Sequence, residues 1–475
     1  MADLHALSAT ELTPLYHTRT LSPVDVTRAV LAHIEAWEPQ LCATWALDAD
    51  EALRMAAASE ARWATGAALG PLDGVPVTLK ENIATRGVPQ PLGCAATALT
   101  PAAEDAPPAA RLREAGAVFV ARTTMPDWGM LSSGLSSFHK LARNPWDLRK
   151  NPGGSSAGAA AAAAAGYGPL HLGTDIGGSI RLPASWCGVV GFKPSLGRIP
   201  IKPPYAGRVA GPICRSVADA ALAMQILSRP DWRDATSLPA QPIAWAEHGQ
   251  RAQQADSGRA ATGLRIGLLL DAGWGDALQP AVRAAIEAAA RAFEAQGAIV
   301  ELLGPVSTRA MVQGLDRFWR MRSWMDYATL PAERQARVLP YIRDWIASGQ
   351  QLSAAEVFLG HAQIAALRDA AVTATHRFDC VLSPVSPDVA FPAEQASPLN
   401  DPARPFEHIA YTLPWNMSEQ PALSVPAGHD ADGLPIGLQI IGRRHDDLGV
   451  LQLGALWERL RPALRPWPTP PPPRS

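Results

Sequence analysis

Residues 174–181 read Thr-Asp-Ile-Gly-Gly-Ser-Ile-Arg, and residues 153–158 upstream read Gly-Gly-Ser-Ser-Ala-Gly. Both stretches are glycine-rich and present serine, and their serines Ser155 and Ser179 lie 179 − 155 = 24 residues apart. Gly177 and Gly178 can adopt positive φ, which lets the backbone approach a substrate and direct successive N–H groups at one point. This pattern indicates a hydrolase whose active site is built from loops.

A lysine supplies the third element of the pattern. Residues 75–82 read Val-Pro-Val-Thr-Leu-Lys-Glu-Asn, which predicts a short buried strand that ends near Lys80. Only five of the 42 basic residues are lysine, so this chain uses arginine for ordinary positive charge. A buried lysine can lose its proton and act as a base, whereas arginine cannot. Taken alone, Lys80 also fits a strand-end lysine that reaches solvent, and the two serine motifs favour the catalytic interpretation.

Together these residues predict nucleophilic catalysis without histidine. Ser179 is the expected nucleophile, and Ser155 is expected to pass its proton to neutral Lys80, since serine is too weak an acid to attack unaided. Attack on a carbonyl would leave an oxyanion, which backbone N–H groups can stabilise. The expected donors are the N–H groups of Ile176, Gly177, Gly178 and Ser179.

Three other interpretations of the glycine-rich stretches are weaker. Residues 154–158 match G-x-S-x-G, which would make Ser156 a nucleophile, but that motif requires a preceding strand and residues 143–152 are a polar segment with two prolines. Neither glycine cluster is followed by the Lys-Ser/Thr pair of a nucleotide-binding loop. Tight turns against a helix expected at residues 157–165 would explain the glycines, but not the serines and Lys80 together.

The combination resembles the amidase signature family of serine hydrolases that cleave carbon–nitrogen bonds. The resemblance covers roughly residues 5–460 and extends beyond the serines to four further segments, at residues 72–82, 144–146, 187–195 and 433–442. It implies an α/β/α fold with a central mixed sheet flanked by helices, formed by a single domain over residues 1–465. It also implies Lys80 as base, Ser155 as a bridging serine that follows a cis peptide bond, and Ser179 as nucleophile.

The resemblance implies supporting roles as well. Asp175 and Arg181 are expected to form a buried pair that holds the nucleophile loop, with a surface ion pair as the alternative. Ser156 is expected to form hydrogen bonds near Lys80 rather than to react. The apolar pocket is expected to include Gly129, Met130, Leu131 and Phe138.

The implied substrates are small, largely hydrophobic amides. Aryl amides (as for an aryl acylamidase), carbamates (urethanes) and esters all remain open. A glutamine-hydrolysing A subunit of a tRNA-dependent amidotransferase is the alternative, although Leu182 stands where such proteins favour glutamine. Glu419 departs from a glycine common in the family and places a carboxylate near a late loop; it is expected to affect substrate preference if that loop borders the pocket. A catalytically silent binding or scaffold homologue is a further alternative, opposed by the presence of Lys80, Ser155 and Ser179.

Composition limits the partners. A 475-residue chain with 47% hydrophobic residues and a net charge of −2 can bury a large core, and it has no electrostatic attraction to nucleic acid or to an acidic membrane. No apolar run is long enough to span a bilayer, and residues 1–13 lack a signal-peptide pattern, so we expect a cytoplasmic enzyme. Five scattered cysteines favour reduced thiols over disulfides or a zinc site. We expect a small-molecule amide or carbamate as partner, no metal and no cofactor, while a homodimer stays open.

Periodicity and capping residues predict several elements. Residues 231–262 read as a surface connection, and residues 305–375 as a helical cover beside the pocket that contains Trp319, Trp324, Trp345 and Phe358. Residues 466–475 contain six prolines and are expected to form a disordered tail. The other expected elements are helices at residues 8–16, 22–37, 50–65, 157–165 and 279–296 and a strand at residues 264–270.

Overall fold

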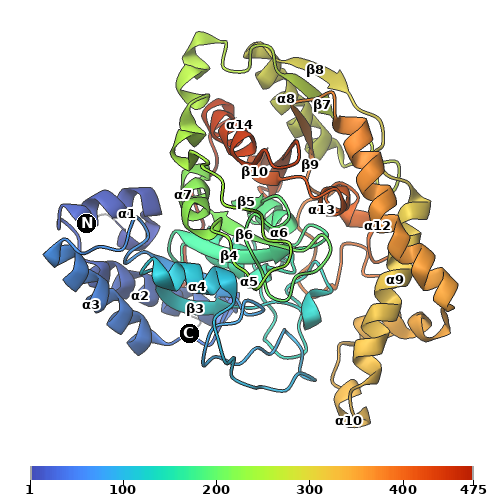
Figure 1. Cartoon of the computed structure of the whole chain (residues 1–475), viewed down its shortest axis with the longest axis horizontal. Coiled ribbons are helices and arrows are strands. Elements are labelled where there is room, and N and C mark those ends of the chain that lie inside the picture. The colour runs from blue at the N-terminus through green and yellow to red at the C-terminus, as the bar shows by residue number, and fades with distance from the viewer. Residues whose placement is uncertain (1–2, 473–475) are drawn as a thin grey trace.

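The computed structural model describes residues 3–472 and has one mixed sheet of eleven strands at its centre (Figure 1). The strand order across the sheet is β1-β3-β2-β4-β6-β5-β10-β11-β9-β7-β8. The strands are β1 (Thr44–Trp45), β2 (Pro76–Lys80), β3 (Val118–Thr123), β4 (Leu170–Asp175), β5 (Val190–Lys193), β6 (Val209–Cys214), β7 (Arg265–Leu268), β8 (Ile299–Leu302), β9 (Cys380–Pro384), β10 (Ala422–His429) and β11 (Pro435–Gly442).

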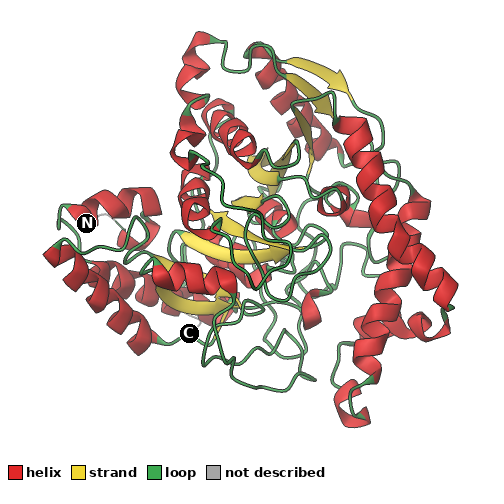
Figure 2. Cartoon of the chain, viewed as in Figure 1, coloured by secondary structure: helices red, strands yellow, loops and turns green. Residues whose placement is uncertain are grey.

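Helices surround this sheet, and long loops gather below its centre in the view of Figure 2. The expected α/β architecture, a mixed sheet flanked by helices, is confirmed. The helices are α1 (Ala9–His17), α2 (Pro23–Leu41), α3 (Ala49–Thr65), α4 (Pro107–Glu114), α5 (Ala157–Ala165), α6 (Arg181–Trp186), α7 (Val217–Leu227), α8 (Pro280–Ala295), α9 (Arg309–Ala328), α10 (Ala332–Gln335), α11 (Pro340–Ile346), α12 (Ala354–Thr375), α13 (Leu413–Met417) and α14 (Asp447–Leu460).

The pairing of β2 with β4 brings two predicted site segments together. These strands are parallel neighbours, with Leu79 opposite Leu172 in the register. The carboxyl ends of parallel neighbours meet at the same edge of a sheet, so Lys80, the last residue of β2, lies near the loop that follows Asp175 at the end of β4. The loop with Ser155 precedes α5, which packs on β2 and β4.

The run of alanines in α5 allows this helix to be buried on all sides. Every residue of the helix is buried, and small side chains let neighbouring elements approach closely. A Cβ at Gly158 would lie 2.1 Å from the carbonyl oxygen of Ala43, so only glycine fits there. The helix ends at Gly166, which has φ +87°. The predicted bounds of this helix, residues 157–165, are confirmed.

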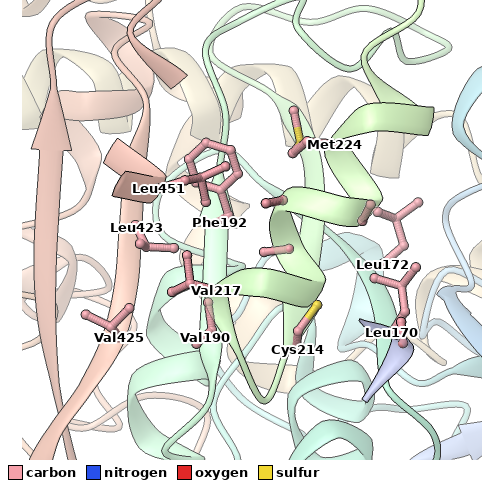
Figure 3. Packing of buried hydrophobic residues seen from close by; sticks show 14 of the residues in the cluster. Leu170, Leu172, Val190, Phe192, Cys214, Val217, Met224, Leu423, Val425 and Leu451 are labelled. Atoms are coloured by element: carbon pink, nitrogen blue, oxygen red, sulfur yellow. The ribbon is translucent and has the colours of Figure 1, made fainter. Parts of the chain in front are cut away.

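The main core lies between the sheet and helices α7 and α14. Figure 3 shows apolar side chains from strands β4, β5, β6 and β10 meeting those of both helices. These residues are fully or almost fully buried, and at about 25 cal/mol per Å² of apolar surface such a core is the main stabilising term of the fold. The labelled residues are Leu170, Leu172, Val190, Phe192, Cys214, Val217, Met224, Leu423, Val425 and Leu451.

The other predicted elements differ from the structure mainly at their ends. The helix expected at residues 22–37 continues to Leu41, and the strand expected at residues 264–270 is limited to Arg265–Leu268. Residues 231–262 contain only two short 3-10 helices, Trp245–Gly249 and Ala252–Ser257.

The segments expected as a cover and a tail also have defined positions. Helices α9 to α12 account for most of residues 305–375 and lie on the opposite side of the molecule from α1 to α3 (Figure 1). In the C-terminal segment, the Trp467 ring lies 4.4 Å from the Arg215 guanidinium and also packs against Trp146, so this part of the expected tail is held against the domain. Residues 473–475 lie outside the described residues. Across residues 3–472, no helix combines the length and the hydropathy needed to cross a bilayer.

Candidate active site

Lys80 is fully buried at the end of β2 and contacts two of the predicted serines. Its Nζ donates hydrogen bonds to Ser155 Oγ at 2.8 Å and to Ser156 Oγ at 3.1 Å. Burial, together with the positive charge of Arg208, lowers the pKa of Lys80 well below its ordinary value, because both disfavour the ammonium form. This lysine can therefore become neutral at a pH where an exposed lysine stays charged.

Ser156 connects Lys80 to the strand that leads to the nucleophile loop. Its Oγ accepts from Lys80 and from the Thr174 N–H, and it donates to the Thr174 carbonyl oxygen at 3.1 Å. The Ser156 N–H donates to the Ser179 carbonyl oxygen at 3.1 Å. Every hydrogen-bonding group of Ser156 named here is engaged with its neighbours, which suits a residue that positions others.

Ser155 follows a cis peptide bond after Gly154, as the resemblance implied. Close packing explains the glycines before it: a Cβ at Gly153 would lie 2.3 Å from the Trp186 ring, and a Cβ at Gly154 would lie 2.6 Å from the Ser133 nitrogen. The loop is thus fixed against two neighbouring segments. It holds Ser155 Oγ between Lys80 and the cavity described below.

Asp175 and Arg181 form a bidentate, completely buried ion pair that encloses the Ser179 loop. The two contacts are Arg181 Nε to Asp175 Oδ2 at 3.0 Å and Arg181 Nη2 to Asp175 Oδ1 at 2.9 Å. Burial alone would raise the pKa of Asp175, but the charge and hydrogen bonds of Arg181 outweigh it and hold this pKa well below its ordinary value. The expected buried arrangement is thus present, and the surface alternative is not.

Three residues from the C-terminal part of the chain complete this network, and sequence reasoning missed their roles. Arg181 donates to Gln439 Oε1 at 2.7 Å, to Asn416 Oδ1 at 2.6 Å and to the Thr412 carbonyl oxygen at 3.0 Å. Asn416 in turn donates to Asp175 Oδ1 at 2.8 Å. The only sequence signal was the cluster of polar residues within otherwise apolar segments around Asn416 and Gln439.

The loop after β4 offers fewer oxyanion donors than predicted. The N–H of Gly178 already donates to Asp175 Oδ1 at 2.9 Å, because the loop curls around that carboxylate. Among the hydrogen bonds of the described residues, none uses the N–H of Ile176, Gly177 or Ser179. The set of candidate donors therefore narrows to these three.

Ser155 and Ser179 open onto a cavity of about 720 Å³. Ser179 is 9% exposed and Ser155 is 4% exposed, so their hydroxyl groups lie at the floor of the cavity. None of the described hydrogen bonds joins the two hydroxyls directly. Lys80 and Ser156 do not line the cavity and lie behind Ser155. From the cavity inward, Ser179 and Ser155 therefore come first, and Lys80 lies behind them.

Three of the four predicted pocket residues line this cavity: Gly129, Met130 and Leu131. A Cβ at Gly129 would lie 3.3 Å from Ser155 Oγ, so glycine keeps this wall close to the serine. Phe138 is a correction, because its ring lies edge-on against Trp45, with centroids 5.4 Å apart, and outside the cavity lining. Its backbone N–H is bonded to the Gly93 carbonyl oxygen, which holds this part of the loop away from the site.

The opposite wall comes from the helical cover and from a late loop. Trp319 of α9 and Trp345 of α11 line the cavity, with Phe406 packed edge-on against both rings. Trp324 and Phe358, the other two aromatics named for the predicted cover, do not reach it: Trp324 packs against Tyr327, and Phe358 is 73% exposed. Sequence alone could not distinguish these positions.

Two residues that were weighed for specificity lie outside the cavity. Leu182 is fully buried behind the nucleophile loop, next to Gly178. Glu419 forms ion pairs with Arg368 and Arg444 and has φ +66°. The condition for an effect of Glu419 on substrate preference, that its loop borders the pocket, is not met, because Glu419 does not line the cavity. Within residues 3–472, no three His, Cys, Asp or Glu side chains are grouped so that they could hold a metal ion.

Comparisons with known proteins identify relatives along nearly the whole chain. The family model described as Amidase matches residues 25–451. An acylamidase of Rhodococcus erythropolis is 34% identical, with 98% of this chain and 97% of the relative covered. The glutamyl-tRNA(Gln) amidotransferase A subunit of Chloroflexus aggregans is 33% identical, with 97% of each covered.

Solved structures give the same result. The crystal structure of a bacterial aryl acylamidase of the amidase signature family matches with a TM-score of 0.85 and 30% sequence identity, over 96% of each chain. A native peptide amidase from Stenotrophomonas maltophilia matches with a TM-score of 0.80 and 26% identity, over 98% of each chain. Because the family model spans most of the chain and the relatives align along nearly all of it, the chain belongs to the amidase signature family and is a serine amidohydrolase.

Proposed function

We propose that this enzyme hydrolyses small, largely hydrophobic amides, aryl amides foremost, through an acyl-enzyme on Ser179. The observation that carries the proposal is the buried contact between Lys80 Nζ and Ser155 Oγ at the floor of a cavity that also exposes Ser179. Lys80 can then act as the base, Ser155 as the proton carrier and Ser179 as the nucleophile. Carbamates and esters have the same reacting carbonyl and belong to the same proposal.

The first half of the reaction forms the acyl-enzyme. Neutral Lys80 accepts the Ser155 proton while Ser155 accepts the Ser179 proton, and Ser179 Oγ attacks the carbonyl carbon. The resulting oxyanion is bound by free backbone N–H groups of the loop, each such donor being worth roughly a hundredfold or more in rate. The tetrahedral intermediate then collapses: the C–N bond breaks, and the leaving amine takes a proton from Ser155, which Lys80 reprotonates.

The second half releases the acid. Water attacks the ester carbonyl of acyl-Ser179 and gives its proton to the same Ser155–Lys80 pair. Collapse of this second intermediate returns the proton to Ser179 Oγ and frees the carboxylic acid. The Ser155 and Ser179 hydroxyls are not bonded to each other without substrate, and such contacts commonly tighten only when substrate is bound.

The cavity wall supports the aryl preference. Trp128, Trp319, Trp345 and Phe406 line it, and aromatic rings gain roughly 0.5–1.5 kcal/mol from edge-to-face contacts beyond the area they bury. The names of two relatives, an acylamidase and an aryl acylamidase, point the same way.

A second candidate is glutamine hydrolysis as the A subunit of a tRNA-dependent amidotransferase. The observation that favours it is the 33% identity to proteins of that name over 97% of this chain. The acylamidase relative is equally similar, so identity does not choose between them. Leu182, which first argued against this candidate, lies outside the cavity and carries no weight.

Purified enzyme assayed alone against a panel separates the two candidates. We expect turnover of 4-nitroacetanilide and of a phenyl carbamate, and labelling of Ser179 by a fluorophosphonate probe. Strong glutamine hydrolysis with no activity on anilides would replace the proposal by the second candidate. Absence of both activities together with no labelling would favour a silent homologue. Ser179→Ala is the matched control and should not be labelled.

A further inference from the structure

Arg208 lies beside the Ser179 loop, and its guanidinium group has no acceptor among residues 3–472. It precedes β6, and the antiparallel register that sets Asp175 opposite Val209 places Arg208 next to Ile176, three residues from Ser179. The side chain lines the cavity and is partly buried. No salt bridge or side-chain hydrogen bond within residues 3–472 involves it. Arginine carries five N–H donors and stays charged, so a guanidinium withdrawn from water calls for an anionic partner.

A second guanidinium group without an ion pair among the described residues lies near Arg208. The Arg322 guanidinium, on α9, stacks 4.6 Å from the centroid of the Tyr205 ring and lines the same cavity. Tyr205 accepts a backbone hydrogen bond from the Arg208 N–H, which fixes the turn that carries both side chains. The Tyr205 hydroxyl is buried next to the Trp319 and Arg322 side chains, so it supports the Arg322 side chain rather than facing the cavity. Repulsion from Arg322 adds to burial in lowering the pKa of Arg208, so the two cations are within electrostatic reach of each other.

The charges around the cavity do not balance. Lys202 is paired with Glu104 and Asp175 with Arg181, so these cancel. Among the described lining residues this leaves three unpaired guanidinium groups, those of Arg208, Arg322 and Arg334, against one unpaired carboxylate, that of Asp326. A ligand with a negative charge would reduce this excess, whereas a neutral amide would leave it.

We propose that Arg208 and Arg322 form a subsite for a carboxylate that the substrate carries within a few bonds of the scissile amide. The preferred substrate is then an amide with one apolar portion and one carboxylate. This inference rests on the proposed function for the reaction and adds the charge of the substrate. Arg208 lies beside the floor and Arg322 on the helical cover, so the carboxylate would connect the two walls.

Matched acid and ester substrates test the subsite. One pair carries the charge on the acyl side, glutaric acid 4-nitroanilide and its methyl ester; the other carries it on the amine side, 4-acetamidobenzoate and its methyl ester. We expect kcat/KM to favour the acid in at least one pair by roughly ten- to a hundredfold, the range for a hydrogen bond to a charged group. Equal or better turnover of the ester in both pairs would overturn the inference.

Variants show whether Arg208 carries the preference. Arg208→Met should abolish the acid-to-ester ratio, mainly through KM of the acid, and Arg208→Lys should restore part of it. A merely structural role would lower both substrates of a pair alike and leave the ratio unchanged, which would overturn the inference. Lys202→Met removes a cation of the same cavity that is already paired, and it should keep the ratio.

A binding measurement separates this inference from the proposed function. Calorimetric titration of Ser179→Ala with glutaranilic acid and with its methyl ester needs no turnover. Tighter binding of the acid, lost in Ser179→Ala/Arg208→Met, supports the subsite even if anilides are not hydrolysed. Turnover of neutral anilides with no difference in binding would leave the proposed function in place and refute the subsite.

Discussion

The serine–lysine centre and the helical cover face each other across one cavity, and they differ in the kinds of side chain they contain and in how those side chains are held. In the centre, Lys80, Ser156 and Asp175 are buried, and each has named hydrogen-bond partners within 3.1 Å. In the cover, the side chains that line the cavity are of mixed kinds: aromatic rings such as that of Trp319 stand beside Arg322, for which the described residues offer no salt bridge. The difference indicates that one wall fixes the chemistry and the other adjusts the choice of substrate.

Physical constraints explain the contrast. A buried polar group must find a partner of the right geometry, so few residue types fit at each position of the centre. The aromatic part of the cover needs only volume and contact area, which several side chains can supply. Changes in the centre should therefore be severe and independent of substrate, whereas changes in the cover should be mild and depend on substrate.

The largest effect is expected for Ser179→Ala. Loss of the nucleophile should lower kcat on the order of 10⁴-fold or more for every substrate, because no acyl-enzyme can form. Steady-state assays on one anilide and one carbamate measure it, with circular dichroism to establish that the fold is intact. More than a trace of activity on either substrate would contradict the role of Ser179 as the nucleophile and, with it, the contrast between the centre and the cover.

Asp175→Asn tests whether the buried Asp175–Arg181 ion pair holds the Ser179 loop. The substitution leaves the fully buried Arg181 without its charge partner, and breaking such a pair costs roughly 3–5 kcal/mol of the free energy of unfolding. Urea denaturation measures it. The control is Asp256→Asn at the exposed Arg459–Asp256 pair, where less than about 1 kcal/mol is expected. Equal effects of the two substitutions would mean that the buried pair does not hold the loop.

Trp319→Ala tests the cover. Removal of this ring from the cavity wall should raise KM for aryl amides roughly tenfold or less, while kcat for a small aliphatic amide stays close to wild type. Phe358→Ala removes an aromatic ring of the same cover that is exposed to solvent, and it should change neither constant. A loss of kcat of equal size on both classes of amide would show that Trp319 supports the reaction itself and not the choice of substrate.

The smallest effect is expected for Glu419→Gly. Two ion pairs with Arg368 and Arg444 are lost, but φ +66° favours glycine by about 1 kcal/mol, so the free energy of unfolding should change by only about 1 kcal/mol. The preference among anilides, carbamates and esters should not change. A clear change in that preference would place Glu419 nearer the substrate than the cavity lining indicates.

The sequence predicted the centre better than the cover for the same physical reason. Lys80, Ser155 and Ser179 stand in short motifs whose glycines are required by close contacts, such as that of Gly153 with the Trp186 ring. The α/β fold followed from the same motifs. Phe138 was placed wrongly because an aromatic residue in a loop can face either the cavity or a neighbour such as Trp45.

Long-range contacts were beyond the sequence. Asn416 and Gln439 hold Arg181 from more than 200 positions along the chain, and no local pattern fixes such a pairing. The reduced role of Gly178 was also invisible, because it depends on where the Asp175 carboxylate points. Arg208 looked like ordinary positive charge until its position beside Ile176 and its lack of a partner were known.

The central claim is that neutral Lys80 acts as the base, and the pH dependence of kcat/KM tests it most directly. Burial lowers the pKa of Lys80, so activity should rise with pH as the neutral form grows, with a midpoint below that of an ordinary lysine. The measurement runs from pH 6 to about 10 on one anilide, for wild type, Lys80→Ala and Lys80→Arg. We predict that Lys80→Arg is nearly as inactive as Lys80→Ala, since arginine keeps the charge but cannot accept a proton. Substantial activity of Lys80→Arg, with a flat profile in the wild type, would contradict the account.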